Sequence, residues 1–126
     1  MKTIIQTAHA PAPIGPYNQA IKHGNTLYVS GQIGLDPNSM EWVSNSITEE
    51  TEQVMKNLEA VLKAAHMTFE NVVKSTIFLN NMDNFTEVNA VYGSRFDETQ
   101  APARETVAVK TLPKNVRVEI SMIAIE

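Results

Sequence analysis

The sequence lacks cysteine entirely and has only three arginines among its 126 residues. Without cysteine the chain forms no disulfide and offers neither a thiol nucleophile nor a thiolate metal ligand. The lysines are scattered, and the formal net charge at pH 7 is −4. Binding to nucleic acid or to an anionic membrane surface relies on clustered lysine and arginine. This composition therefore argues against both kinds of partner.

Long apolar runs are also missing. No window approaches the length of a membrane-spanning helix, and Gln6, Thr7 and His9 interrupt an N-terminal stretch that faintly resembles a signal peptide. We therefore expect a cytoplasmic protein with no membrane partner. Apolar residues make up 43 % and charged residues 19 % of the chain, which predicts a single globular domain over residues 1–126.

Familiar catalytic motifs are absent as well. The sequence has no H-E-x-x-H zinc motif, no G-x-S-x-G nucleophile elbow, no Walker loop and no dinucleotide fingerprint. Its three histidines lie far apart without metal-ligand spacing, so we expect no metal site. The segment Gly31-Gln32-Ile33-Gly34 matches the G-x-x-G of RNA-binding KH domains in letters only, because it ends a predicted strand in an acidic chain.

Hydrophobic periodicity predicts two helices among several strands. Ser46-Ile47-Thr48-Glu49 has the pattern of a capping box, and apolar residues recur at helical spacing from there to His66. A second amphipathic helix is predicted from about Asp83 to Phe96. Period-two patterns and turn residues predict strands over the ranges 2–6, 18–22, 26–35, 71–80, 104–111 and 116–125.

Strand alternation assigns side chains to faces. In the strand 26–35 it groups Leu27, Val29, Ile33 and Leu35 on one face, and in the strand 71–80 it groups Val73, Ile77 and Leu79. The order of elements predicts an α+β fold, a β-sheet with two helices on one face. The other face is predicted to carry Arg104, Thr106, Ala108, Glu119 and Phe78. That mixture is too apolar for bulk water, so we expect other subunits to cover it.

Arg104 is the residue that most strongly suggests a binding site. It follows Pro102 at the start of a predicted strand, on the same face as the small residues Thr106 and Ala108, which could form the floor of a pocket. A guanidinium group fits a carboxylate through two parallel hydrogen bonds. The alternative interpretation is an ordinary surface arginine.

Six short segments carry a resemblance to a known family. They are Ile14-Gly15-Pro16-Tyr17-Asn18-Gln19-Ala20, Ser30-Gly31-Gln32-Ile33-Gly34, Asn89-Ala90-Val91-Tyr92, Pro102-Ala103-Arg104, Leu112-Pro113-Lys114 and Val118-Glu119-Ile120. In this order and spacing the chain resembles the Rid family, the YjgF-type group of reactive-intermediate deaminases, and most of all its RidA branch. The resemblance covers the chain nearly from end to end.

The resemblance implies a chorismate-mutase-like subunit with a mixed sheet, assembled as a homotrimer with clefts between neighbouring subunits. It implies hydrolysis of 2-imino acids such as 2-iminobutanoate and 2-iminopropanoate, or their enamine tautomers, to 2-keto acids and ammonia. In the family, pyridoxal-phosphate enzymes acting on threonine or serine release these substrates. The deaminase itself carries no cofactor.

The resemblance also implies roles for individual residues. Arg104 would bind the substrate carboxylate, and Tyr17 would line the cleft and hold substrate or water through its hydroxyl. Glu119 would activate the attacking water and return a proton to the departing amine. The alternative for Glu119 is a surface salt bridge to Arg117 or Lys110.

Four further residues complete the predicted site, namely Ser30, Gly31, Asn89 and Thr106. Ser30 and Gly31 would contact the substrate, Gly31 through its backbone, and Asn89 would reach the cleft from a neighbouring subunit or else be solvated. Many RidA proteins carry Ser-Cys after the arginine, where this chain has Glu105-Thr106. Thr106 either replaces the cysteine through its backbone carbonyl or changes the pocket, and alternation points Glu105 away from Arg104.

Two other function classes stay open at this point. A non-catalytic module that binds small carboxylates, or a chaperone-like surface, would use the same cleft as a deaminase. An endoribonuclease or translation inhibitor is disfavoured, because the chain is acidic and has no basic groove.

Overall fold

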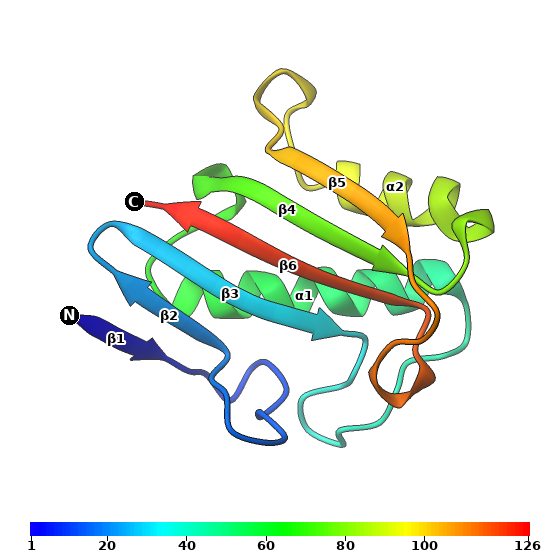
Figure 1. The fold of residues 1–126 in the computed structure, drawn as a ribbon, viewed down its shortest axis with the longest axis horizontal. Coiled ribbons are helices and arrows are strands. Elements are labelled where there is room, and N and C mark those ends of the chain that lie inside the picture. The colour runs from blue at the N-terminus through cyan, green and yellow to red at the C-terminus, as the bar shows by residue number, and fades with distance from the viewer.

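One mixed sheet organises the chain in a computed structural model that describes residues 1–126. The elements are β1 (Lys2–Ile5), β2 (Ala20–His23), β3 (Thr26–Ile33), α1 (Ile47–Ala64), β4 (Val72–Leu79), α2 (Phe85–Gly93), β5 (Ala103–Ala108) and β6 (Val118–Ile125). The strands lie in the order β1-β2-β3-β6-β4-β5 (Figure 1). Neighbouring strands are antiparallel, except that β4 and β5 run parallel.

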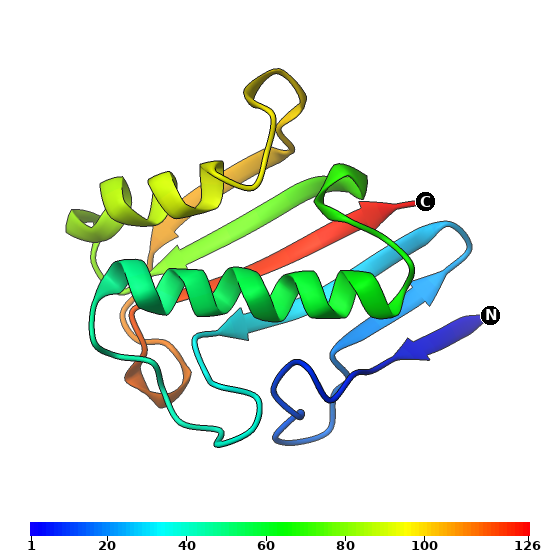
Figure 2. The same cartoon turned by 180° about the vertical axis from the view of Figure 1, so that it is seen from behind.

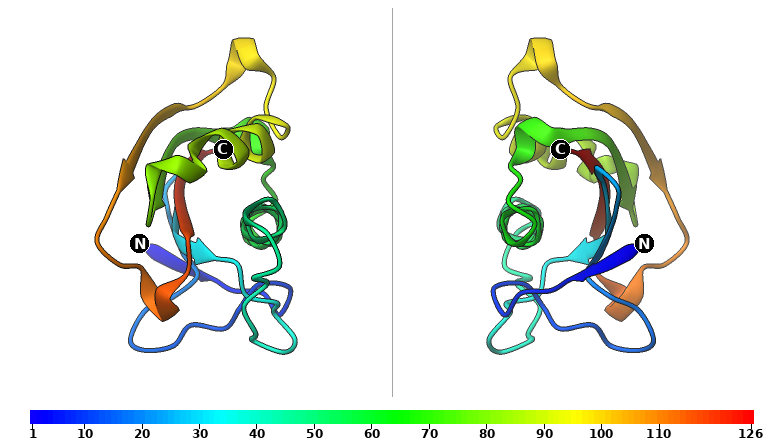
Figure 3. Two further views of the ribbon diagram at one scale, coloured as in Figure 1. Left: turned by 90° about the vertical axis from the view of Figure 1, so that its right-hand side faces the viewer. Right: turned by 90° about the vertical axis from the view of Figure 1, so that its left-hand side faces the viewer.

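Both helices lie against the same face of this sheet, as Figure 2 shows. Figure 3 views α1 along its axis and places it to one side of the curved strands. The structure therefore confirms the predicted α+β arrangement of a sheet with two helices on one face. Neither helix combines the length and apolar character that crossing a lipid bilayer requires.

Helix α1 supplies most of the core. Ser46 caps its N-terminus by accepting a hydrogen bond from the Glu49 backbone N–H at 3.0 Å, which is one half of the predicted capping box. The apolar stripe of α1 is fully buried against the sheet and consists of Val54, Met55, Leu58, Val61 and Leu62. Burial of each such side chain contributes about 1.5–3 kcal/mol, so this stripe holds the helix in place.

Two β-bulges reverse the alternation that the sequence predicts. In β3 the register shifts between Val29 and Gln32, so Gln32 is buried and Ile33 pairs with Glu119 on the opposite face. In β4 it shifts between Val72 and Lys74, which leaves Val73 44 % exposed. The predicted placement of Ile33 and Val73 with the buried residues was therefore wrong, because one extra residue turns every following side chain over.

No helix covers the second face of the sheet, which we call the open face. Residues directly opposite each other on neighbouring strands share a face, and Ile4, Ile21, Tyr28 and Ile123 form one such row across four strands. Tyr28 is 51 % exposed and Ile4 is 52 % exposed. An exposed apolar surface of this kind is typical of sites of protein association.

Candidate functional site

The predicted site residues fall on two different faces of the sheet. In the parallel β4–β5 pair, Arg104 lies opposite Ser75 and Thr106 opposite Ile77, and both partners are buried beneath the helices. Glu119 lies opposite Phe78 on the open face. The prediction that Arg104, Thr106 and Ala108 share a face with Glu119 was therefore wrong. Alternation within a strand fixes which residues go together, but not which face of the sheet they occupy.

The first half of the site is built around Arg104. Its Nη1 donates a hydrogen bond to Asn89 Oδ1 on α2 at 2.7 Å. The guanidinium carbon lies 5.2 Å from the ring centre of Tyr92 and 5.8 Å from that of Phe85, distances at which an aromatic ring attracts a cation. Arg104 forms no ion pair within the chain. Its charge is therefore positioned by α2 but left free for an anion.

Tyr92, one of the aromatic neighbours of Arg104, belongs to both the core and the site. It is only 4 % exposed, and its hydroxyl donates to Ser75 Oγ at 2.9 Å. It also lines, with Asn89 and Arg104, a cavity of about 670 Å³. The available signal was the i, i+3 spacing of Asn89 and Tyr92, which places both on one side of a helix.

Thr106 lies two residues beyond Arg104 on the same face of β5. Its hydroxyl oxygen is buried and has no hydrogen-bond partner within the chain. A buried polar group without a partner carries a free-energy penalty, so this hydroxyl is suited to a bound molecule or a neighbouring subunit. Glu105 points to the open face, as alternation predicted, where it pairs with Lys74 at 3.2 Å.

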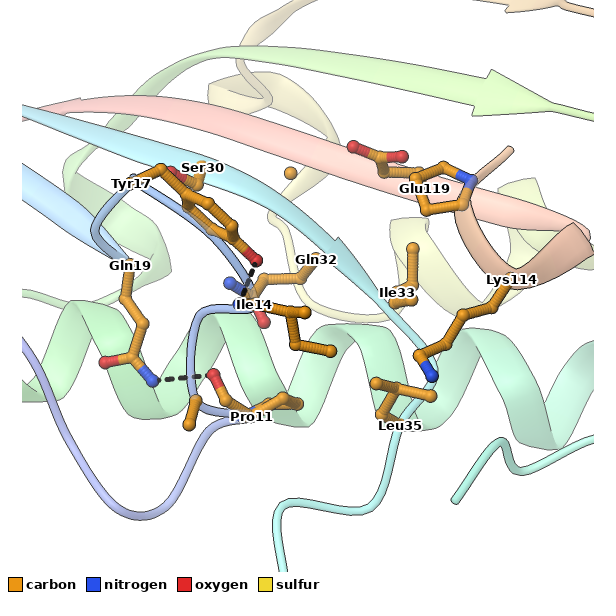
Figure 4. Close-up of a pocket in the computed structure, with 13 residues that line it drawn as sticks. Pro11, Ile14, Tyr17, Gln19, Ser30, Gln32, Ile33, Leu35, Lys114 and Glu119 are labelled. Atoms are coloured by element: carbon orange, nitrogen blue, oxygen red, sulfur yellow. Dashed lines mark hydrogen bonds between the residues drawn. The ribbon is translucent and has the colours of Figure 1, made fainter. Parts of the chain in front are cut away.

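The second half of the site is a cavity of about 530 Å³ beside the end of β3 (Figure 4). Tyr17, Ser30, Gly31 and Glu119 all line it. Ser30 Oγ donates to the Asn18 carbonyl at 2.6 Å, and the Tyr17 hydroxyl accepts a hydrogen bond from the Ile14 backbone at 3.4 Å. The structure thus brings together four of the predicted residues.

Gln19 shapes this cavity and was not predicted to do so. Its side chain is 2 % exposed. Its amide nitrogen donates to the carbonyls of Thr7, Ala10 and Pro11, and its oxygen accepts from the Thr7 backbone at 2.7 Å. One buried amide therefore holds the loop that carries Tyr17. In the sequence, nothing about a glutamine between Asn18 and Ala20 indicates that its side chain is buried and holds this loop.

Glu119 is the acidic group of the second half-site. Burial raises the pKa of its carboxyl above the ordinary value of 4.5, because desolvation disfavours the charged form. Neither a hydrogen bond nor an ion pair within the chain engages this carboxylate. The alternative of a salt bridge to Arg117 or Lys110 was therefore wrong, since Arg117 Nε instead binds Glu50 Oε1 at 2.6 Å.

Gly31 explains how the carboxylate fits beside β3. A Cβ atom at this position would come within 2.8 Å of Glu119 Cδ, so a larger residue would displace the acid. The two half-sites together offer an unpaired guanidinium, which is suited to bind a carboxylate, and a partly desolvated acid, which is suited to proton transfer. No three His, Asp or Glu side chains gather closely enough to hold a metal ion.

Comparisons with known proteins identify the family of the chain. The family model described as Endoribonuclease L-PSP matches residues 7–126. A RutC family protein of Synechocystis is 53 % identical over 123 residues, covering 97 % of this chain and 95 % of that protein. The mouse protein named 2-iminobutanoate/2-iminopropanoate deaminase is 45 % identical over 126 residues, covering 100 % of this chain and 93 % of that protein.

Solved structures show the same fold. The Rid family protein YyfA of Yersinia pestis superposes with a TM-score of 0.96 at 46 % sequence identity, and the match covers 100 % of both chains. The resemblance found in the sequence is confirmed. The chain belongs to the Endoribonuclease L-PSP family, which is the YjgF or Rid family.

Proposed function

We propose that this protein hydrolyses 2-imino acids and their enamine tautomers, such as 2-iminobutanoate and 2-iminopropanoate, to 2-keto acids and ammonia without a cofactor. The observation that carries the proposal is the pair of half-sites. Arg104 is an unpaired cation held by Asn89, and Glu119 is an unpaired acid whose pKa burial raises. The name of the mouse relative supports the same reaction.

The reaction suits this small set of groups. Water adds to the imine carbon, and the resulting carbinolamine loses its nitrogen as ammonia, which leaves the ketone. Glu119 takes a proton from the attacking water and returns it to the departing amine. Arg104 binds the substrate carboxylate through paired hydrogen bonds. Because a protonated imine is already electrophilic, positioning these groups supplies the acceleration that is needed.

The remaining predicted residues have supporting roles in this proposal. Tyr17 and Ser30 enclose the reacting centre on the side of Glu119, and the Gly31 backbone contacts the substrate. Thr106 offers its unpaired hydroxyl beside the carboxylate end. Asn89 keeps the guanidinium in the orientation that a carboxylate requires.

A second copy of the chain completes the site. Arg104 and Glu119 occupy opposite faces of one sheet, so one chain cannot present both to one substrate. The apolar open face gives the copies a surface on which to associate. We propose that the copies assemble as a closed ring of three, a homotrimer. Each of its three clefts receives Arg104 from one subunit and Glu119 from the neighbouring subunit.

The test generates 2-iminobutanoate in place from threonine with a dehydratase, while semicarbazide competes to trap the imine. The wild-type protein is expected to suppress trapping, and Arg104→Ala is expected to lose that effect. Arg95→Ala is the matched control, because Arg95 pairs with Glu52 outside both cavities. Equal trapping with and without wild-type protein, when assembly is intact, would overturn the proposal and leave a carboxylate-binding module.

A further inference from the structure

Lys114 lines the same cavity as Glu119 but has no part in the chemistry described above. It lies in the loop between β5 and β6 with a φ of 57°, and Asn115 after it has the same φ. Two consecutive non-glycine residues in the left-handed region cost free energy. Such strain is retained where the surrounding structure requires a specific orientation, and it concentrates at functional sites.

Lys114 is exposed to solvent and at the same time lines the cavity. In the view of Figure 4 its side chain runs from the loop in the direction of Leu35, which lines the same cavity. Ile33 and Ile14 also line this cavity. The β-bulge in β3 is what turns Ile33 toward this side of the sheet. The cavity therefore combines apolar side chains with one positive charge.

This charge is not neutralised within the chain. Lys114 takes part in none of the four ion pairs, although Glu119 lines the same cavity. The cavity volume of about 530 Å³ falls in the range of about 300–1,000 Å³ that is typical for ligands much larger than 2-iminobutanoate. An ethyl side chain would fill only part of a cavity of this size and would make no polar contact with Lys114.

We propose that Lys114 determines specificity by binding a carboxylate at the end of the substrate side chain, so that the protein also hydrolyses 2-imino dicarboxylic acids such as 2-iminoglutarate. Arg104 binds the carboxylate next to the imine, the methylene groups lie along Ile33 and Leu35, and Lys114 binds the distal carboxylate. The reaction is again addition of water, which converts 2-iminoglutarate into 2-oxoglutarate and ammonia. This inference rests on the proposed imine hydrolysis.

The test compares kcat/KM for three imines under semicarbazide competition. They are 2-iminobutanoate, 2-iminopentanoate as a longer neutral imine, and 2-iminoglutarate, the last two made in place by amino-acid oxidases with catalase present. Lys114→Met removes the charge and keeps the chain length. We expect it to lower kcat/KM for 2-iminoglutarate about tenfold, while the values for the two neutral imines change less than twofold.

Two further variants distinguish the loss of the contact between Lys114 and the distal carboxylate from a loss of folding stability. Lys114→Gly relieves the left-handed strain, so it should melt no earlier than wild type and yet lose the preference for 2-iminoglutarate. Lys110→Met removes a lysine outside the cavity and should leave the kcat/KM for 2-iminoglutarate unchanged relative to the values for the two neutral imines. If Lys114→Met also left this relative value unchanged, the inference would be overturned.

A binding measurement keeps the inference testable if hydrolysis itself fails. Calorimetric titration with 2-oxoglutarate and 2-oxobutanoate requires no turnover. Tighter binding of 2-oxoglutarate by wild type, lost in Lys114→Met, would support the role of Lys114 even if the deaminase proposal were wrong. Equal affinities of the two proteins for 2-oxoglutarate would overturn it.

Discussion

Arg104 and Glu119 extend from opposite faces of one β-sheet, although both belong to a single proposed active site. The register fixes this relationship, because Arg104 lies opposite the buried Ser75 and Glu119 lies opposite Phe78 on the open face. In the proposed mechanism, a sheet that separates the carboxylate-binding group from the acid makes catalysis depend on assembly. Two copies of the chain can supply what one copy holds apart.

Subunit mixing tests this dependence directly. Arg104→Ala and Glu119→Gln should each be nearly inactive when alone. After the two are refolded together in equal amounts, roughly a quarter of the clefts will receive Arg104 from one subunit and Glu119 from the other, if mixing is random and each cleft lies between two subunits. Imine hydrolysis should therefore recover to roughly a quarter of the wild-type rate.

The same experiment has an internal control. Mixing each variant with itself by the same refolding procedure should give no recovery. If the mixture of the two variants is also no more active than their average, then both groups act within one subunit and the arrangement proposed for the cleft is wrong. Native mass spectrometry, which resolves the mass difference of the Arg104→Ala subunit, would establish that the mixed assemblies formed.

Much of the fold was predictable from local patterns in the sequence. The Ser46 cap and the apolar stripe through Leu58 marked α1, which the structure places at Ile47–Ala64. Alternation also grouped Arg104 with Thr106 correctly. Each of these features is decided by residues within a few positions of one another, which is the range over which sequence periodicity carries information.

The features that the sequence did not predict depend on contacts between distant parts of the chain. The bulges near Gln32 and Val73 arise from pairing with β6, and the face on which Arg104 lies is set by the register of β5 against β4. The buried Glu50–Arg117 pair joins residues 67 positions apart. A one-residue change in pairing moves a side chain to the other face, and no local pattern records it.

Gly31→Ala should reduce activity without unfolding the protein. The added Cβ would meet the end of the flexible Glu119 side chain, so the carboxylate would move while the backbone stays in place. We expect a loss in kcat/KM of about tenfold or more, as for displacement of a positioned catalytic group. The melting temperature should stay close to that of wild type.

Gly34→Ala is the contrasting variant. Its Cβ would come within 2.9 Å of the Glu50 backbone carbonyl oxygen, which cannot rotate away as a side chain can. Here the melting temperature should fall clearly. If Gly31→Ala lost stability as Gly34→Ala does, its loss of activity would say nothing about the position of Glu119.

The pH dependence of hydrolysis should follow Glu119. Its pKa is raised above 4.5 by burial, and only the carboxylate form can accept a proton from water. The enzyme-catalysed rate should therefore fall as the pH is lowered through this raised pKa, and the fall should begin at a higher pH than for an ordinary glutamate. Glu119→Gln should be slow at every pH, without this transition. A wild-type profile that is flat down to pH 4.5 would contradict the assignment.

The same pKa shift has the opposite consequence for stability. Below the unfolded-state pKa the carboxyl is protonated in both the folded and the unfolded state. The pKa shift therefore does not change the free energy of unfolding in that pH range. As the pH rises, the unfolded chain loses its proton first, and the folded state loses stability until the folded-state pKa is passed. Glu119→Gln should therefore be more stable than wild type at neutral pH, and urea unfolding should show this difference disappearing below the pKa of an ordinary glutamate.

The fully buried carboxylate of Glu50 ties the start of β6 to α1. It accepts hydrogen bonds from the Arg117 side chain at 2.6 Å and from the Arg117 backbone at 2.9 Å. Glu50→Ala would leave the Arg117 guanidinium beside a cavity without its partner. We expect the free energy of unfolding to fall by about 3 kcal/mol, the lower end for a broken buried ion pair, because the Arg117 side chain is 28 % exposed.

Glu59→Ala is the matched control on the same helix, since Glu59 is exposed and forms no ion pair. Its effect in urea unfolding should stay within about 0.5 kcal/mol. Similar urea unfolding midpoints for the Glu50 and Glu59 variants would show that water solvates the Arg117 guanidinium well enough to replace Glu50. A large difference would mean that this pair holds the strand that begins one residue later and carries Glu119, so that the position of the proposed acid depends on a buried charge remote from the substrate.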